Sequence, residues 1–383
     1  MSRYKALGVD VRKKGIKAFE AIVENLFPGA FCVVTRDPRD PGVGLVSHTD
    51  SAGSKPIVSY LCWRETGDPS WFRGLAQDVV AMNLDDLLCV GAEPVVFIDY
   101  VAFNTMLIDR VQLLSALSEG FAGCFGMLAE NGMEILFGGG ETADLPDQMR
   151  TLDVSGALFG RVELERVVTG ERVEPGDLIV GLRSGGPARY EEGLNSGLMC
   201  NGLTLARNCL LKHEYLERYP ELAHPGRGRY TGRFGFDDHV DDLGMTVGQA
   251  LACPTRIFAP VATEVLKEVG GSVHGMVHNT GGGQTKCLRL GGETHYVKDS
   301  LPEPDPIFTL IQREAGVEWR EMYEDFNMGV GFEFIVEPGS AEDVLRVAEG
   351  FGVGAMVIGR CEEGGVENSL VIESRHGKFS YGA

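Results

Sequence analysis

The pattern of apolar and polar positions is clearest between Asp78 and Pro94, DVVAMNLDDLLCVGAEP. Apolar residues recur there at helical spacing, no Gly or Pro interrupts them before Gly91, and Pro94 closes the stretch, so the pattern predicts a helix. At about 100° per residue, Asp85 returns to within about 20° of Asp78, and Asp86 lies about 80° away. Three carboxylates therefore fall near one side of an apolar helix, where they need a cationic partner or a solvated face.

Four apolar segments predict the strands of a first sheet. They are Val43–Val46, Val95–Phe103, Ile135–Phe137 and Leu152–Arg161. These segments alternate poorly, so both faces of the sheet are predicted to be apolar. With helices on one face only, the other face would expose more apolar surface than a soluble monomer usually carries. We therefore expect a homodimer in which two such sheets pair about a two-fold axis.

The length of 383 residues is large for one core and favours two domains. Glu174–Asp177, EPGD, begins a second series of strands and helices, which places the boundary near Val173. The expected division is residues 1–172 and residues 173–383, and the fold class is α/β (α+β).

Composition excludes several classes of partner. The net charge of −20 argues against binding nucleic acid or an anionic membrane surface. It leaves small phosphorylated ligands open, because a divalent metal reverses the local sign. The sequence shows neither an apolar run near 18 residues nor a signal peptide, so no membrane partner is expected. Nine cysteines without C-x-x-C spacing indicate reduced thiols in the cytoplasm.

Candidate chemistry follows the first predicted strand, in HTDSAGSK, His48 to Lys55. Small residues allow backbone N–H groups to approach a phosphate, Ser54 adds a hydroxyl, and Lys55 adds a positive charge. Asp50 lies beside them as a carboxylate. The spacing is not that of the common G-x-x-x-x-G-K-[ST] phosphate loop, and an ordinary turn is the alternative.

Two further glycine-rich segments carry polar groups. GGGETADLPD, Gly138 to Asp147, is expected to be a loop with Glu141, Thr142 and Asp144 at its rim, which suits magnesium; a plain hairpin turn is the alternative. His278 precedes a glycine triplet and could reach a ligand, although a lone His is more often structural.

Taken in order, these segments resemble the aminoimidazole ribonucleotide synthetase (phosphoribosylformylglycinamidine cyclo-ligase) family. The family's TDGVGTK, D-x-VAM-x-x-NDLL-x-x-GAEP, F-x-DY and GGETAEMP motifs are similar to segments of the first half. Its NG-x-(S/T)-L, PTRI, HG-x-x-H-x-TGGG, P-IF and FN-x-GVG motifs are similar to segments of the second. The matching segments are Thr49–Lys55, Asp78–Pro94, Phe97–Tyr100, Gly139–Pro146, Asn201–Leu205, Pro254–Ile257, His274–Gly283, Pro306–Phe308 and Phe326–Gly331.

The resemblance implies a two-domain fold, with an amino-terminal sheet that pairs into a barrel across the dimer and a carboxy-terminal α/β sandwich. It also implies ATP with Mg²⁺, and ring closure of formylglycinamidine ribonucleotide with release of ADP and phosphate. Carried onto this chain, the catalytic residues are Asp86, Lys55 and Glu141, and the metal ligands are Asp50, Asp78, Asp86 and Glu141. The nucleotide contacts are Asp50, Ser54, Lys55, Gly139, Gly140, Thr142, Asn201 and His278. Asp85 ranks below Asp86, because the family has Asn at its position.

Two departures from the family pattern leave alternatives open. A GGFG-like segment before the first strand is missing, since Phe27–Gly44 holds only scattered glycines. The family's SGPHSNG is interpreted here as Ser184–Pro187 followed by an insertion before Asn201, without the His. The alternatives are another ATP-dependent member of the superfamily and a non-catalytic nucleotide-binding paralogue.

Overall fold

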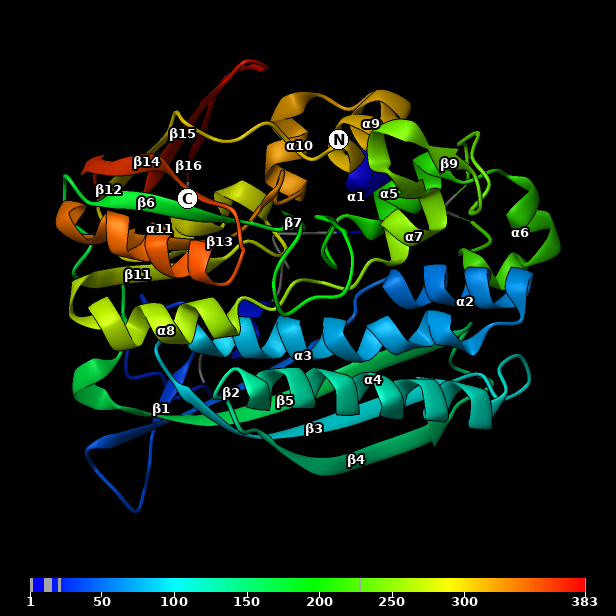
Figure 1. The fold of residues 1–383 in the computed structure, drawn as a ribbon, viewed down its shortest axis with the longest axis horizontal. Helices are drawn as coiled ribbons and strands as arrows, with labels where there is room; N and C mark the ends of the chain where they lie inside the picture. Colours follow the sequence, from blue (N-terminus) through cyan, green and yellow to red (C-terminus); the bar gives the residue numbers. More distant parts are fainter. Residues whose placement is uncertain (1–2, 10–15, 20–21, 227–228, 383) are drawn as a thin grey trace.

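The computed structural model describes residues 3–9, 16–19, 22–226 and 229–382, and it has two main sheets (Figure 1). The first half contains α1 (Arg3–Ala6), β1 (Val34–Arg36), β2 (Val43–Ser51), α2 (Lys55–Thr66), α3 (Arg73–Leu88), β3 (Glu93–Phe103), α4 (Arg110–Glu130), β4 (Leu136–Asp144) and β5 (Leu152–Glu163). The second half contains β6 (Leu178–Arg183), β7 (Gly185–Gly186), β8 (Asn195–Ser196), α5 (Leu203–Leu210), α6 (Glu214–Arg218), β9 (His239–Val240), β10 (Met245–Thr246), α7 (Val247–Ala252), α8 (Ala259–Val269), β11 (Val273–His278), β12 (Thr294–Lys298), α9 (Pro306–Ala315), α10 (Trp319–Asp325), β13 (Val330–Val336), α11 (Ala341–Gly350), β14 (Ala355–Glu363), β15 (Ser369–Ser374) and β16 (Gly377–Gly382). Short 3₁₀ segments link them, among which η7 (Gly283–Arg289) matters for the site.

The amino-terminal sheet has the order β1-β2-β5-β3-β4. All four predicted strands are present, and β1 is added at one edge. β4 corrects one expectation: the glycine-rich segment that was predicted to be a loop continues as strand to Asp144, because it pairs in parallel with β3 as far as Phe103. β2 likewise continues to Ser51, so Asp50 lies in a strand rather than in a loop.

Helices α3 and α4 cover one face of this sheet (Figure 1). The predicted helix is correct in kind but ends at Leu88 rather than at Pro94, since Gly91 takes a left-handed conformation and β3 begins at Glu93. By length and composition α4 is apolar enough to span a membrane. In the structure it packs on the sheet, with Phe121 5.6 Å from Phe97 between ring centroids.

Among the described residues, no helix covers the opposite face of the sheet (Figure 1). Ile98 and Tyr100 on β3, Leu136 on β4 and Phe159 on β5 are 36–69% exposed there. Along β5 the burial alternates strictly between its two faces, because only one face is covered by helices. The predicted uncovered apolar face is therefore present.

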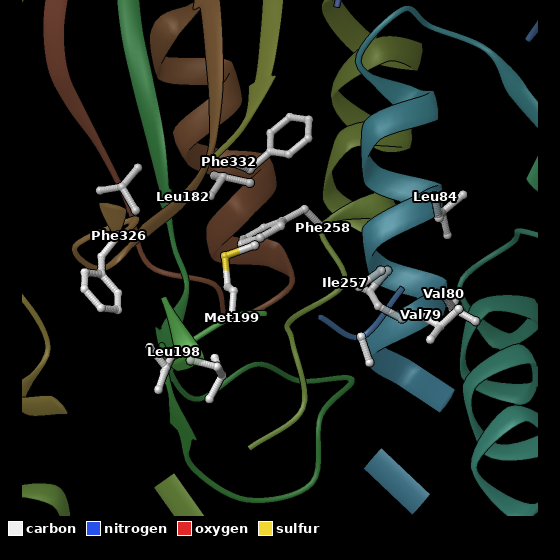
Figure 2. Packing of buried hydrophobic residues seen from close by; sticks show 14 of the residues in the cluster. Val79, Val80, Leu84, Leu182, Leu198, Met199, Ile257, Phe258, Phe326 and Phe332 are labelled. Carbon is white, nitrogen blue, oxygen red and sulfur yellow. The ribbon is translucent and has the colours of Figure 1, made fainter. Parts of the chain in front are cut away.

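The carboxy-terminal sheet has the order β11-β13-β6-β14-β12-β15-β16 and carries α8 and α11 on one side (Figure 1). The core continues from this half into α3: Val79, Val80 and Leu84 lie near Ile257 and Phe258 (Figure 2). Asp85 strengthens this junction, because its two carboxylate oxygens accept the Phe258 N–H at 3.1 and 3.0 Å, just before α8 begins. Burial raises the pKa of Asp85 well above its ordinary value. The low rank given to Asp85 as a ligand thus agrees with its position as a buried cap.

Candidate functional site

Asp86, near the end of α3, is held by three side chains from three different elements. His278 Nδ1 lies 2.6 Å from its Oδ1, His48 Nε2 lies 3.3 Å from its Oδ2, and Lys286 Nζ lies 3.6 Å from the same Oδ2. Burial alone would raise the pKa of Asp86, but the charge of Lys286 and the hydrogen bonds from His278 and His48 hold it well below its ordinary value. Asp86 is therefore an anionic centre between β2, α3 and the glycine triplet.

The backbone carbonyl of Asp50 is connected to Asp86 through Asn83 and His48. Asn83 Nδ2 donates to the Asp50 carbonyl at 3.3 Å, and its Oδ1 lies 3.2 Å from His48 Nδ1. The Asp50 carboxylate is partly exposed and accepts the Ser51 N–H at 2.8 Å. Because β2 alternates its side chains, His48 and Asp50 point to the helix-covered side of the sheet, toward α3.

Lys55 lies somewhere other than expected. It is the first residue of α2, fully buried, and its Nζ contacts Asp78 Oδ1 at 2.5 Å and the Cys253 carbonyl at 2.6 Å. The same Asp78 oxygen accepts the Thr255 N–H at 2.8 Å and its hydroxyl at 2.6 Å. Lys55 thus contacts an ion-pair partner at the junction of the two halves and does not face an open cleft. Asp78 in turn pairs with Lys55 and does not lie in one group with the other carboxylates.

Ser54 and Asn201 meet the start of α5. The Ser54 hydroxyl lies 3.0 Å from that of Thr204, and Asn201 Nδ2 donates to the Asp325 carbonyl at 3.0 Å. The turn that presents Ser54 depends on Gly53, which has a φ of 61° and whose Cβ, if present, would lie 3.1 Å from the Cys200 carbonyl. These two predicted ligand residues therefore lie at one seam between the halves.

Gly139, Gly140, Glu141 and Thr142 lie on the edge strand β4. A Cβ on Gly140 would collide with the Asp99 carboxylate, so only glycine fits opposite this half-buried acid, whose pKa is raised by burial. Glu141 pairs with Tyr100 across the strands, and directly opposed residues share a face. Glu141 therefore belongs to the uncovered face, on the other side of the sheet from Asp86.

The predicted metal ligands do not form one cluster within a single chain. Over the part of the chain that the structure describes, no group of three or more His, Cys, Asp or Glu side chains is arranged to hold a metal. The structure brings Asp50 and Asp86 into one network, places Asp78 against Lys55, and places Glu141 across the sheet. His278 is fully buried, and burial lowers its pKa, so that it supports Asp86 as a neutral ring.

Three contributors to this site were missed from the sequence: His48, Asn83 and Lys286. Lys286 lies on η7 directly after the glycine triplet, bonds to the Thr280 hydroxyl and lies 4.6 Å from the centre of the Phe31 ring. The TK at positions 285–286 could have indicated it, as a lysine just past a glycine-rich turn. Nothing in the local pattern distinguishes His48 from a strand residue, because its role depends on a helix 35 residues later.

The structure also gives a simpler alignment of the SGPHSNG motif. β7 pairs with β8, so the segment between them is a loop that returns to its starting point. Ser196–Gly202 reads SGLMCNG and therefore aligns with the motif without any insertion. Met199 and Cys200 then occupy the places of the His and the second Ser. Met199 is 1% exposed and packs beside Phe258 and Leu198 (Figure 2). A buried thioether there has no acid–base function.

Two protein-family models match the sequence. AIR synthase related protein, N-terminal domain, matches residues 30–162, and AIR synthase related protein, C-terminal domain, matches residues 174–372. The chain belongs to the AIR synthase related family. Among relatives, the phosphoribosylformylglycinamidine cyclo-ligase of Methanococcus maripaludis is 33% identical, covering 95% of this chain and 93% of the relative. That of Methanothermobacter thermautotrophicus is 36% identical, covering 86% and 82%. The resemblance inferred from the motifs is thereby confirmed.

Two solved structures share the fold. Phosphoribosylformylglycinamidine synthase II from Thermotoga maritima has a TM-score of 0.56 at 14% identity, covering 99% of this chain and 50% of that chain. T. maritima PurL complexed with ATP has a TM-score of 0.52 at 13% identity, covering 96% and 48%. At such identities the likeness concerns the two-domain α/β architecture alone.

Proposed function

We propose that the protein is an ATP-dependent cyclo-ligase. It closes formylglycinamidine ribonucleotide to aminoimidazole ribonucleotide, with release of ADP and phosphate, as a cytoplasmic enzyme of de novo purine biosynthesis. The observation that carries this proposal is the relationship at 33% identity over 95% of the chain to a curated enzyme of that name. The network around Asp86 supports it, because it unites residues of both halves in one anionic centre.

The nucleotide is proposed to be ATP, as in the PurL complex of the same fold. Mg²⁺ takes one or two carboxylates and completes its shell with phosphate oxygens and water. Asp50 and Asp86 fit that requirement: Asp50 joins the network around Asp86 through its backbone carbonyl, its carboxylate is partly exposed, and the pKa of Asp86 is held low, which keeps Asp86 anionic. We assign the metal to these two residues and remove Asp78 from the set, because Asp78 is fully buried in a close ion pair with Lys55 at 2.5 Å, whereas Lys286 lies 3.6 Å from Asp86. When bound, the ion would neutralise the phosphate charge.

The chain's own residues have separate tasks in this proposal. His278 and His48 orient the Asp86 carboxylate, and Ser54, Gly139, Gly140, Thr142 and Asn201 provide donors and room for the nucleotide. Lys55 acts indirectly, by fixing the start of α2 against Cys253 and Thr255. Ring closure then needs the amine held close to the activated carbon, so positioning and charge stabilisation provide most of the rate.

A homodimer is part of the proposal. The uncovered face exposes the apolar side chains of Ile98, Tyr100, Leu136 and Phe159, and pairing it with its copy about a two-fold axis, as the predicted barrel requires, would bury them. Glu141 lies on the same face, so its predicted place in the site depends on that pairing.

The experiment is a coupled assay for ADP, with formylglycinamidine ribonucleotide present and absent. Wild type should release ADP only with the amidine. Asp86→Asn should reduce turnover by at least a hundredfold while the protein remains folded, whereas Asp241→Asn, at a fully exposed position, should match wild type. Near-normal turnover of Asp86→Asn would remove Asp86 from the mechanism, and no amidine dependence in wild type would reject the cyclo-ligase.

One observation favours a second candidate, a nucleotide-binding paralogue without this chemistry. Met199 stands where the family motif has His, and Lys55 and His278 are both fully buried. Such a protein would bind ATP and release no ADP with the amidine, and the same assay separates the two. Release of ADP with a different acceptor would indicate another catalytic member of the superfamily.

A further inference from the structure

A cavity lies beside Thr204, whose hydroxyl is 3.0 Å from that of Ser54. It has a volume of about 420 Å³ and is lined by Leu7, Gly8, Thr204, Arg207, Asn208 and His224, among others. That volume lies within the range of small-molecule sites. None of the residues assigned above to nucleotide or metal lines it.

The charge at the base of this cavity is unusual. Arg207 is 6% exposed, and its Nη1 donates to the Leu222 carbonyl at 3.1 Å and to the Tyr230 hydroxyl at 3.3 Å. Both partners are neutral, and Arg207 forms no ion pair with any acid of the described ranges, while its buried Nε has no hydrogen-bond partner there. A buried cation without a counter-ion costs several kcal/mol, so an anion is expected near it.

Arg256 provides the comparison within the same molecule. It is fully buried too, but its guanidinium forms an ion pair with Glu191 at 2.8 Å and donates to three backbone carbonyls. The fold therefore neutralises one deeply buried arginine with its own carboxylate and leaves the other facing a cavity. Next to Arg207, Asn208 is 5% exposed, and its Oδ1 also lacks a partner in the described structure.

We infer that this cavity binds a phosphate monoester, the 5′-phosphate of the ribosyl substrate. Guanidinium groups bind phosphate through charge-assisted hydrogen bonds, and amide, hydroxyl and imidazole groups complete such a site. Thr204 joins the cavity to Ser54, which is four residues after Asp50, so a ligand anchored at Arg207 extends toward the anionic centre. This inference rests on the proposed function, because it names the part of that substrate that the cavity holds.

The test is isothermal titration of the full chain with three probes: ribose 5-phosphate, orthophosphate, and ADP with magnesium. Wild type should bind ribose 5-phosphate more tightly than orthophosphate. Arg207→Gln should weaken ribose 5-phosphate binding at least tenfold and leave ADP binding within twofold, which also reports that the variant is folded. Arg233→Gln is the matched control, because Arg233 is 66% exposed and pairs with Glu314 on the surface.

Should Arg207→Gln not fold, the exposed rim residue gives the second variant: His224→Gln should weaken ribose 5-phosphate binding about threefold. The inference is overturned if a folded Arg207→Gln binds ribose 5-phosphate with unchanged affinity. If Arg207→Gln does not fold, unchanged affinity in His224→Gln overturns it. Absence of ribose 5-phosphate binding in wild type does so too. No turnover enters these titrations. A wild type that binds ribose 5-phosphate through Arg207 but shows no amidine-dependent ADP release would reject the cyclo-ligase and keep the phosphate site.

Discussion

Replacing Lys55 with Met isolates the buried ion pair at the junction of the halves. Both side chains are 0% exposed, and the variant leaves the Asp78 carboxylate buried without its cation. Removing one partner of a buried pair costs about 3–5 kcal/mol. In the variant, Asp78 Oδ1 still accepts hydrogen bonds from the Thr255 N–H and hydroxyl, although Oδ2 has no partner in the described structure. Because these two hydrogen bonds remain, we expect a cost at the lower end of the range, about 3 kcal/mol.

With an unfolding entropy of about 2.1 cal/mol/K per residue, 383 residues that unfold as one unit give about 0.8 kcal/mol per °C, so the melting temperature of Lys55→Met should fall by roughly 4 °C. Calorimetry measures this, and Asp78→Asn in the same background should recover about half, because it removes the orphaned charge. Lys267→Met, at an exposed pair with Glu264, should be neutral. A fall below 2 °C, or no recovery in the double variant, would refute the structural role and return Lys55 to the nucleotide.

Three further predictions concern the dimer, the pH dependence and the glycine strand. Ile98→Asp, on the uncovered face, should give a monomer in sedimentation at micromolar protein, whereas Val366→Asp, at a 92% exposed position, should not; a dimeric Ile98→Asp would move the interface elsewhere. Burial and nearby carboxylates raise the pKa of Asp325 from 3.8 to about 7, so the native state retains this proton and stability falls as pH rises through that window. Asp325→Asn should therefore match wild type at pH 4 and be more stable at pH 8 by a few kcal/mol, since one pKa unit is about 1.4 kcal/mol, and equal unfolding curves at pH 8 would contradict this. Gly140→Ala should lower both the stability and the ATP affinity, because its Cβ would collide with Asp99. Gly123→Ala, with open space at its Cβ, should raise the free energy of unfolding by about 0.5–1 kcal/mol in denaturant titrations. Equal effects of the two substitutions would show that the backbone of β4 can move away from Asp99.

Local pattern predicted the elements of the first half well. The helix around Asp85 and Asp86 and the four strands were all found, because their apolar spacing is set by one covered face. The errors lie at the ends. The glycines at 138–140 were predicted to belong to a loop, although pairing with β3 keeps this segment extended.

The site was predictable only in part, for a physical reason. Helical geometry places Asp78, Asp85 and Asp86 near one side, but their roles are set by distant partners: Lys55, the start of α8, and His278. Spacing along one helix cannot show which carboxylate meets a lysine and which meets a histidine. Arg207 was missed because a buried arginine in an apolar helix looks like any other until its lack of a counter-ion is visible.

The three carboxylates of α3 also determine whether either half of the chain can fold without the other. Each one contacts a residue from beyond position 190: Asp78 accepts the Thr255 N–H, Asp85 accepts the Phe258 N–H, and Asp86 lies 2.6 Å from His278 Nδ1. A fragment ending near Val173 would retain all three acids in an apolar helix with none of those partners. The two halves are thus separate sheets but one cooperative unit. Expressed on separate plasmids, they should remain insoluble alone and recover only when made together, so this chain tolerates a break in the backbone far better than the loss of either half.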